Sequence, residues 1–112
     1  MKLRKACLKD SKDLAELNHA LMLSERYDGI LPVEELIPRM EEFLKTDYDA
    51  FWILSDDEQA GYILIKHAAQ PIYIRQMYIK PEHQRKGLGS QTIRMIAEYY
   101  HVHTIDVEVM VW

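Results

Sequence analysis

The sequence predicts one mixed α/β domain, and three observations lead to this fold class. Apolar residues alternate as in strands in some segments and recur at helical spacing in others, so both kinds of element follow one another along the chain. A glycine-containing turn joins an apolar strand-like run at residues 72–79 to an amphipathic run at residues 88–100. The chain has 112 residues and is 48% hydrophobic, which suits a single core.

The N-terminal half predicts a strand followed by two helices. Residues 2–8 alternate enough for a short strand, and Asp10 or Ser11 then offers an N-cap for the first helix. The apolar face of this helix carries Leu14, Leu17 and Leu21. A second helix is expected to begin near Pro32, with the apolar residues Val33, Leu36, Ile37, Met40 and Leu44. Pro38 lies inside this helix and should kink or divide it, because proline cannot donate a backbone hydrogen bond.

The C-terminal half predicts four strands and one helix. Residues 50–55 and 61–66 are compact apolar runs on either side of a polar turn, so they predict a hairpin. A central strand follows at residues 72–79, and a third helix at residues 88–100 buries Ile93, Ile96, Ala97 and Tyr100. The last strand is predicted over residues 104–112, where apolar and polar positions alternate.

Composition excludes several classes of protein. The net charge of −4 argues against a general nucleic-acid or membrane-surface binder. Cys7 is the single cysteine, so no internal disulfide framework exists, and we expect it to be a small core residue of the first strand. No apolar run could span a membrane and no signal-peptide pattern is present, so we expect a cytoplasmic protein. His101 and His103 lack the further ligands that a structural zinc site needs, and no metal is expected.

The segment between the central strand and the third helix is the strongest functional signal. It reads Gln84-Arg85-Lys86-Gly87-Leu88-Gly89-Ser90. A glycine-bearing turn that leads from a strand into a helix presents unpaired backbone N–H groups at the positive end of the helix dipole. Such a turn binds phosphate, and Arg85 and Lys86 add positive charge at the same place. We therefore predict an anion-binding turn. The neighbouring His83 could touch a phosphate, although an exposed turn residue is the simpler interpretation.

Two common phosphate loops do not match this turn. A P-loop needs a lysine followed by serine or threonine after its last glycine, whereas Gly89 is followed by Ser90 and Gln91. A dinucleotide-binding fingerprint needs a third small residue where Thr92 stands, and a first strand near the N-terminus.

The pattern that does match is Q/R-x-x-G-x-G/A, preceded by an apolar strand and a proline. In this chain it reads Met77-Tyr78-Ile79-Lys80-Pro81-Glu82-His83-Gln84-Arg85-Lys86-Gly87-Leu88-Gly89. This segment resembles the acetyl-CoA-binding segment of the GNAT superfamily of N-acetyltransferases, and the order of predicted elements matches that family up to its fifth strand. The resemblance implies a mixed, mostly antiparallel sheet with helices on both faces, formed by one domain over residues 1–112. The family's usual C-terminal helix and last two strands would be missing.

The resemblance also implies a function and a set of binding residues. The protein would be an acetyl-CoA-dependent N-acetyltransferase that acts on a primary amine of a small molecule or peptide, with acetyl-CoA as cosubstrate. The backbone of Met77, Tyr78 and Ile79 would pair with the pantetheine arm, and the backbone N–H groups of residues 85–90 would hold the pyrophosphate. The expected cofactor-binding residues are Met77, Tyr78, Ile79, Gln84, Arg85, Lys86, Gly87, Leu88, Gly89 and Ser90.

A base is needed as well, because the amine arrives protonated. Reaching the neutral form at pH 7 from a lysine-like pKa of about 10.4 costs roughly 4.6 kcal/mol. Many family members carry an acid near the middle of the fourth strand, where this chain has Arg75 and Gln76. Members that resemble the ribosomal-protein alanine acetyltransferases instead carry a glutamate on the fifth strand, and Glu108 aligns with it. We predict Glu108 as the catalytic base; a solvated or salt-bridged edge carboxylate is the alternative interpretation.

A second interpretation is a weakly active or non-catalytic CoA-binding remnant of this fold. The family's last helix usually supplies the tyrosine that protonates the departing thiolate, and no equivalent tyrosine is assigned here. The strand at residues 104–112 would have an unpaired edge, and such edges recruit other strands. We therefore expect a homo-oligomer, strand exchange or a partner chain, with neither nucleic acid nor membrane as partner.

Overall fold

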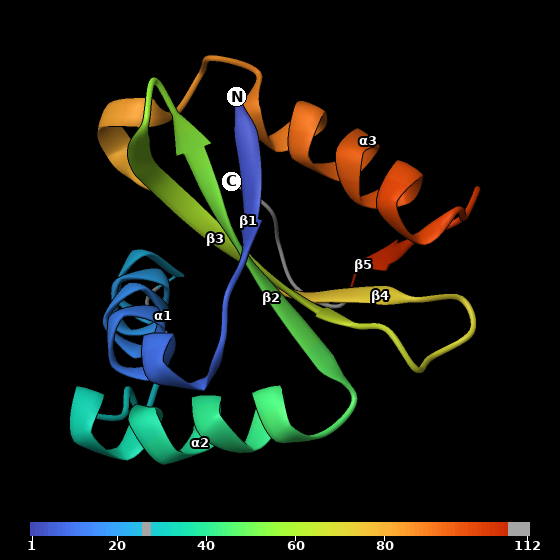
Figure 1. Ribbon diagram of the computed structural model, residues 1–112. Helices are drawn as coiled ribbons and strands as arrows, with labels where there is room; N and C mark the ends of the chain where they lie inside the picture. Colours follow the sequence, from blue (N-terminus) through green and yellow to red (C-terminus); the bar gives the residue numbers. More distant parts are fainter. Residues whose placement is uncertain (26–27, 108–112) are drawn as a thin grey trace.

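A computed structural model describes residues 1–25 and 28–107 (Figure 1). The elements are β1 (Lys2–Lys5), the 3-10 helix η1 (Leu8–Asp10), α1 (Ser11–Glu25), α2 (Val33–Lys45), β2 (Tyr48–Ser55), β3 (Glu58–Lys66), β4 (Tyr73–Ile79), the 3-10 helix η2 (Pro81–His83), α3 (Leu88–Tyr100) and β5 (Asp106–Val107). Their order is the one that the sequence predicts. The predicted base Glu108, with the rest of the last strand, lies outside the described residues.

The strands form one sheet with a helical layer on each face. In the part of the chain that the structure describes, five strands lie in the order β1-β2-β3-β4-β5; the first four are antiparallel, and β5 is parallel to β4. One core packs α1 and α2 on one face of the sheet, and a second core packs α3 on the other (Figure 1). The predicted mixed, mostly antiparallel sheet with helices on both faces is therefore confirmed.

The central strands are buried on both faces, which explains their nearly continuous apolar sequence. Along β2, Phe51 and Ile53 belong to the core beneath α3, whereas Ala50 and Trp52 belong to the core beneath α1 and α2. Successive side chains of a strand point to opposite faces, so covering both faces removes the polar positions that would otherwise alternate.

The hairpin between β2 and β3 is tighter than the sequence predicts. Only Asp56 and Asp57 lie between the strands, and both have positive φ, 52° and 65°. This is the two-residue turn that matches the twist of a β-hairpin, and aspartate is one of the residues that tolerate it. Glu58 and Gln59, expected in the turn, therefore belong to β3.

Two expectations in the N-terminal half of the chain, for Cys7 and for Pro38, are wrong. Cys7 is exposed rather than buried, because β1 ends at Lys5 and the alternation stops there. The N–H of Cys7 donates to the Asp10 carboxylate at 2.9 Å, and Cys7 is the N-cap of η1.

Pro38 does not divide the second helix, which runs unbroken through it. Its ring lies on the exposed side of α2, so the carbonyl that loses its partner can be hydrated.

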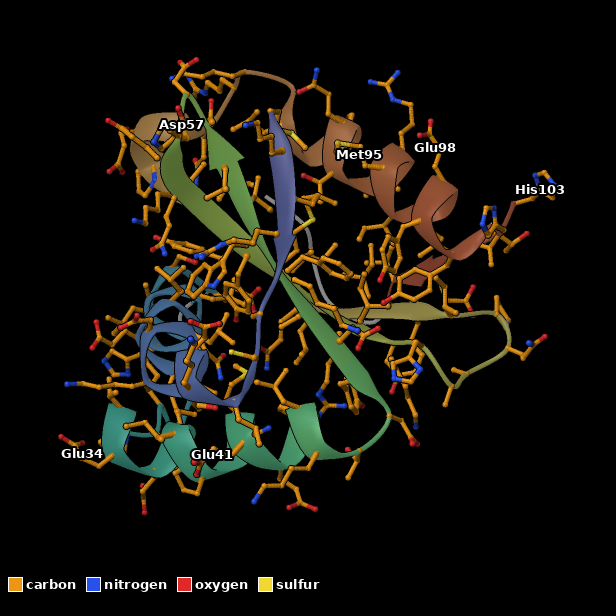
Figure 2. All side chains as sticks on the ribbon, in the orientation of Figure 1. Glu34, Glu41, Asp57, Met95, Glu98 and His103 are labelled. Carbon is orange, nitrogen blue, oxygen red and sulfur yellow. The ribbon has the colours of Figure 1, made fainter. Side chains whose placement is uncertain are left out.

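The acidic residues of α2 lie mostly at the surface of the domain. Glu34 and Glu41 point away from the sheet (Figure 2), as expected for a solvated helix face. Within the two described ranges, no helix is long and apolar enough to cross a membrane.

Gly61 marks a close approach between β3 and β4. A Cβ atom at this position would lie 1.9 Å from the carbonyl oxygen of Tyr78, which belongs to the backbone of β4. A side chain at residue 61 therefore requires the two strands to move apart.

We expect Gly61→Ala to lower the free energy of unfolding by about 1–3 kcal/mol, the usual cost of forcing extra atoms into a packed core. Urea denaturation measures the change. Gly89→Ala is the matched control, because a Cβ there would meet only the Met77 Cε atom at 3.5 Å. Equal urea concentrations at the unfolding midpoint for the two variants would contradict this account of the β3–β4 contact.

Candidate functional site

The turn between β4 and α3 is held by hydrogen bonds within the turn itself. The N–H of His83 donates to Lys80 O at 2.8 Å, and the N–H of Gln84 donates to Pro81 O at 3.2 Å. The Gln84 side chain then donates from Nε2 to Ile79 O at 2.8 Å, which fastens the turn to the last residue of β4. The amide of Gln84 thus shapes the turn, and its role does not require contact with a ligand.

Two left-handed residues direct the chain from this turn into α3. Arg85 has φ 65°, and Gly87, the N-cap of α3, has φ 76°. The first N–H that bonds within the helix is that of Gln91, which donates to Gly87 O at 3.1 Å. The three preceding N–H groups, of Leu88, Gly89 and Ser90, therefore have no partner inside the helix. The first turn of α3 contains no acidic residue, so this end remains positive.

A cavity of about 250 Å³ lies at this helix end. Its lining consists of Ile79, His83, Gln84, Arg85, Gly87, Leu88, Gly89, Ser90 and Ile93. The structure thus brings most of the predicted phosphate-binding residues to one place. Lys86 is exposed but does not belong to the lining.

His83 contradicts the prediction of an exposed turn residue. Its side chain is buried, and Nε2 lies 3.4 Å from a carboxylate oxygen of Glu58, at the start of β3. The 3-10 turn directs the imidazole inward, where it connects the β4–α3 turn to the β2–β3 hairpin. Its Nδ1 atom is buried without a hydrogen-bond partner among the described residues.

The edge of β4 that faces away from β3 carries the described part of β5. Within residues 1–25 and 28–107, β5 pairs with Tyr73 and Ile74. The N–H of Lys80 donates toward β3, to Ala60 O at 2.7 Å. Because backbone groups alternate in direction along a strand, those of Tyr78 also point toward β3, while those of Met77 and Ile79 point away from it.

Of the three residues expected to pair with pantetheine, only Met77 and Ile79 therefore direct backbone groups away from β3. On that side the carbonyl of Ile79 accepts the hydrogen bond from the Gln84 side chain. The Tyr78 backbone turns toward β3 instead, so for Tyr78 the expectation does not fit the strand register.

A bulge in β4 places two polar side chains on the face covered by α1 and α2. The β3–β4 register shifts so that Arg75 is the extra residue. Its guanidinium lies 5.1 Å from the ring centroid of Phe43 in α2. The next residue, Gln76, accepts a hydrogen bond at 2.7 Å from the hydroxyl of Tyr62. Burial, and secondarily the Glu25 carboxylate, raise the pKa of Tyr62 well above its usual value.

The sequence gives no signal for two polar residues of α1 that also lie on this face. Asn18 and Glu25 each have a side-chain atom that is buried without a hydrogen-bond partner among the described residues. At the end of an amphipathic helix a glutamate is normally solvated, so only the packing of α1 on the sheet distinguishes Glu25.

His101, which the sequence analysis considered as a metal ligand, is exposed and follows the last residue of α3 with φ 54°. Among the residues that the structure describes, no group of three or more His, Cys, Asp or Glu side chains could hold a metal ion.

The chain is similar to solved acetyltransferase structures. It matches a possible acetyltransferase from Clostridium difficile 630 at a TM-score of 0.79, with 16% identity, covering 97% of this chain and 79% of the other. A predicted acetyltransferase from Clostridium acetobutylicum, solved with acetyl-CoA, matches at a TM-score of 0.74 with 16% identity, covering 96% of this chain and 80% of the other. The ribosomal-protein-alanine N-acetyltransferase from Brucella melitensis biovar Abortus 2308 matches at a TM-score of 0.73 with 15% identity, covering 98% of this chain and 81% of the other. At these identities the similarity shows the fold alone.

A comparison with curated protein sequences gave no match. The model of the acetyltransferase (GNAT) family matches residues 15–111, which is most of the chain. The match includes β4, the turn that follows it and α3. The protein therefore belongs to the GNAT family of acetyltransferases.

Proposed function

We propose that this protein is an N-acetyltransferase that uses acetyl-CoA to acetylate a primary amine of a small molecule or peptide. Membership of the GNAT family implies acetyl-CoA-dependent acyl transfer in general. The observation that supports the proposal in this chain is the start of α3, where three consecutive N–H groups without helical partners adjoin a cavity of about 250 Å³.

The residues at this cavity fit the diphosphate of coenzyme A. Backbone N–H groups and the helix dipole favour an anion, and Arg85 adds a cationic side chain to the lining. Gly87 has no atom within 4 Å of the position that a Cβ would take, so the space beside the turn is open. The N–H groups of Met77 and Ile79, which point away from β3, would pair with the pantetheine arm as a neighbouring strand does.

The proposed reaction is attack of the neutral amine nitrogen on the thioester carbonyl carbon. A carbon–nitrogen bond forms, the carbon–sulfur bond breaks, and coenzyme A leaves as a thiolate. A backbone N–H of β4 directed at the carbonyl oxygen would stabilise its developing negative charge, a contribution of about 3 kcal/mol per donor in comparable sites. The proton lost by the amine passes to a base, for which we propose Glu108. A thiol is acidic enough to leave without a dedicated proton donor.

One observation favours a second candidate, a CoA-binding protein that does not transfer the acetyl group. The middle of β4 carries Arg75 and Gln76, so no carboxylate stands at this point of the strand. Such a protein would associate with itself or a partner through the edge of β5, where Val107 is exposed. Calorimetry with acetyl-CoA followed by thiol release on an amine panel separates the candidates. Tight binding without release on any amine supports the second candidate, and absence of binding contradicts both.

We expect Gly87→Ala to weaken acetyl-CoA binding about tenfold, which corresponds to about 1.4 kcal/mol. The reason is that a Cβ at this position occupies the open space beside the phosphate-binding N–H groups. Isothermal titration calorimetry measures the change.

The matched control for this variant is Gly29→Ala. Gly29 has φ 72° and, like Gly87, no atom within 4 Å of a Cβ. Both variants therefore carry the same left-handed strain, about 1–2 kcal/mol, but only Gly87 adjoins the cavity. Equal affinities for acetyl-CoA in the two variants would show that the turn does not hold the diphosphate.

Glu108→Gln should lower acetyl transfer by 10²-fold or more, the typical contribution of a general base. Thiol release against the amine panel reports the rate, and calorimetry should show unchanged acetyl-CoA binding. Glu98→Gln, on the exposed surface of α3 (Figure 2), removes the same charge and should leave the rate unchanged. Near-normal transfer by Glu108→Gln would remove Glu108 from the mechanism.

A further inference from the structure

The wall of the cavity at the start of α3 contains a buried titratable side chain, the imidazole of His83. This side chain is only 9% exposed. The N–H of His83 donates to Lys80 O at 2.8 Å, and the 3-10 turn η2 directs the imidazole inward. Histidine is the side chain that ordinarily changes charge between about pH 5 and pH 8. A histidine in the wall of an anion-binding cavity can therefore change the charge of that cavity within this range.

The two ring nitrogens of His83 have different surroundings. Nε2 lies 3.4 Å from a carboxylate oxygen of Glu58, the first residue of β3. Because a carboxylate accepts hydrogen bonds, this contact favours the tautomer with the proton on Nε2. Nδ1 is then the basic nitrogen of the neutral ring, and it is buried without a partner within residues 1–25 and 28–107. A proton on Nδ1 is unfavourable at such a place unless an anion lies nearby.

The charged and titratable groups of the adjoining elements fall into two sets. The acidic set consists of Asp56, Asp57 and Glu58 in the β2–β3 hairpin and Glu82 in η2. The cationic set consists of Lys80, Arg85 and Lys86, which flank η2 on either side. Tyr78, near the end of β4, stays neutral, because burial and secondarily the Glu82 charge raise the pKa of this phenol.

The carboxylate that contacts His83 is a weak partner for an imidazolium. The Glu58 side chain is 74% exposed, so water and salt screen its charge. A diphosphate in the cavity supplies a second anion beside the imidazole. The cavity measures about 250 Å³, so a ligand that fills it lies close to every residue of its wall. Opposite charges attract more strongly in a partly buried site than in water, and protonation of His83 and binding of the diphosphate therefore favour each other.

We propose that His83 is a further coenzyme-binding residue, which takes up a proton at Nδ1 when the diphosphate enters the cavity. The proton comes from solvent and returns to solvent when the coenzyme leaves, while the Nε2–H group stays directed at Glu58. The positive charge adds to the effect of Arg85 and of the N–H groups at the start of α3. The inference rests on the proposed acetyltransferase function and makes coenzyme binding tighter as the pH falls.

The first test is calorimetric titration with 3′-dephospho-coenzyme A at pH 6 and at pH 8. This probe keeps the diphosphate diester, whose charge is constant in this range, and lacks the phosphate monoester, which loses a proton near about pH 6. The wild-type protein should bind the probe about tenfold more tightly at pH 6, the effect of one added charge interaction near a protein surface. Equal affinities at the two pH values would overturn the proposal for His83 alone. Absence of binding of both the probe and acetyl-CoA would contradict the proposed function, and this inference with it.

The variant that tests the residue is His83→Gln, which removes the proton-accepting nitrogen and keeps a polar side chain. Its affinities for the probe at pH 6 and pH 8 should be equal. His103→Gln is the matched control and should keep the tenfold ratio, because His103 is exposed and lies beyond the C-terminal end of α3, away from the cavity (Figure 2). If His83 only held the turn in place, His83→Gln would weaken binding at both pH values and leave their ratio unchanged. That outcome would overturn the proposal.

Proton uptake can also be measured in the wild-type protein, without any variant. Titrations with the same probe at pH 7, in two buffers that differ in their enthalpy of ionisation, give the number of protons taken up per ligand bound. We expect uptake of part of one proton by the wild type and by His103→Gln, and none by His83→Gln. Binding of the probe to the wild type without proton uptake would overturn the proposal, whether or not His83→Gln folds.

Discussion

The site depends on the direction of the backbone groups along β4. One edge of this strand pairs with β3 along its length, and in the described residues β5 pairs with Tyr73 and Ile74 on the other edge. Backbone N–H and C=O groups need partners, so the groups of Met77 and Ile79 that point away from β3 require a further strand or a ligand beside them. The left-handed turn that follows adds the free N–H groups of α3 to the same side. A cofactor with a diphosphate and an amide-containing arm matches both sets.

The rest of the fold keeps β4 in this position. β3 is buried on both faces and approaches β4 so closely at Gly61 that no side chain fits between the backbones. At the end of the strand, the Gln84 side chain donates to the last β4 carbonyl, and the His83 side chain contacts Glu58 in the β2–β3 hairpin. These contacts fix the turn from two directions, so that the N–H groups at the start of α3 are oriented before a ligand arrives.

The two faces of the sheet have different chemistry. The face beneath α3 is an apolar core of branched and aromatic side chains, whereas the face beneath α1 contains Tyr62, Gln76, Asn18 and the Glu25 carboxylate. Polar groups in a core are usually paired, because each unmet one reduces stability.

Local sequence features predicted much of the fold, since the helices, the strands and the glycine-bearing turn before α3 follow from periodicity, glycine positions and the resemblance of one segment. They failed where burial depends on where an element stops: Cys7 follows a strand that ends early, and His83 is turned inward by a 3-10 turn. They also could not single out Glu25, because a terminal helix glutamate has the same pattern whether or not a sheet covers it.

The order of the elements and the backbone conformation at the start of α3 follow from the sequence, because these depend on neighbouring residues. The direction of the backbone groups in β4, with Met77 and Ile79 rather than Tyr78 pointing away from β3, follows only from the folded chain. That choice depends on the register between β3 and β4, which is set by contacts between residues distant in the chain.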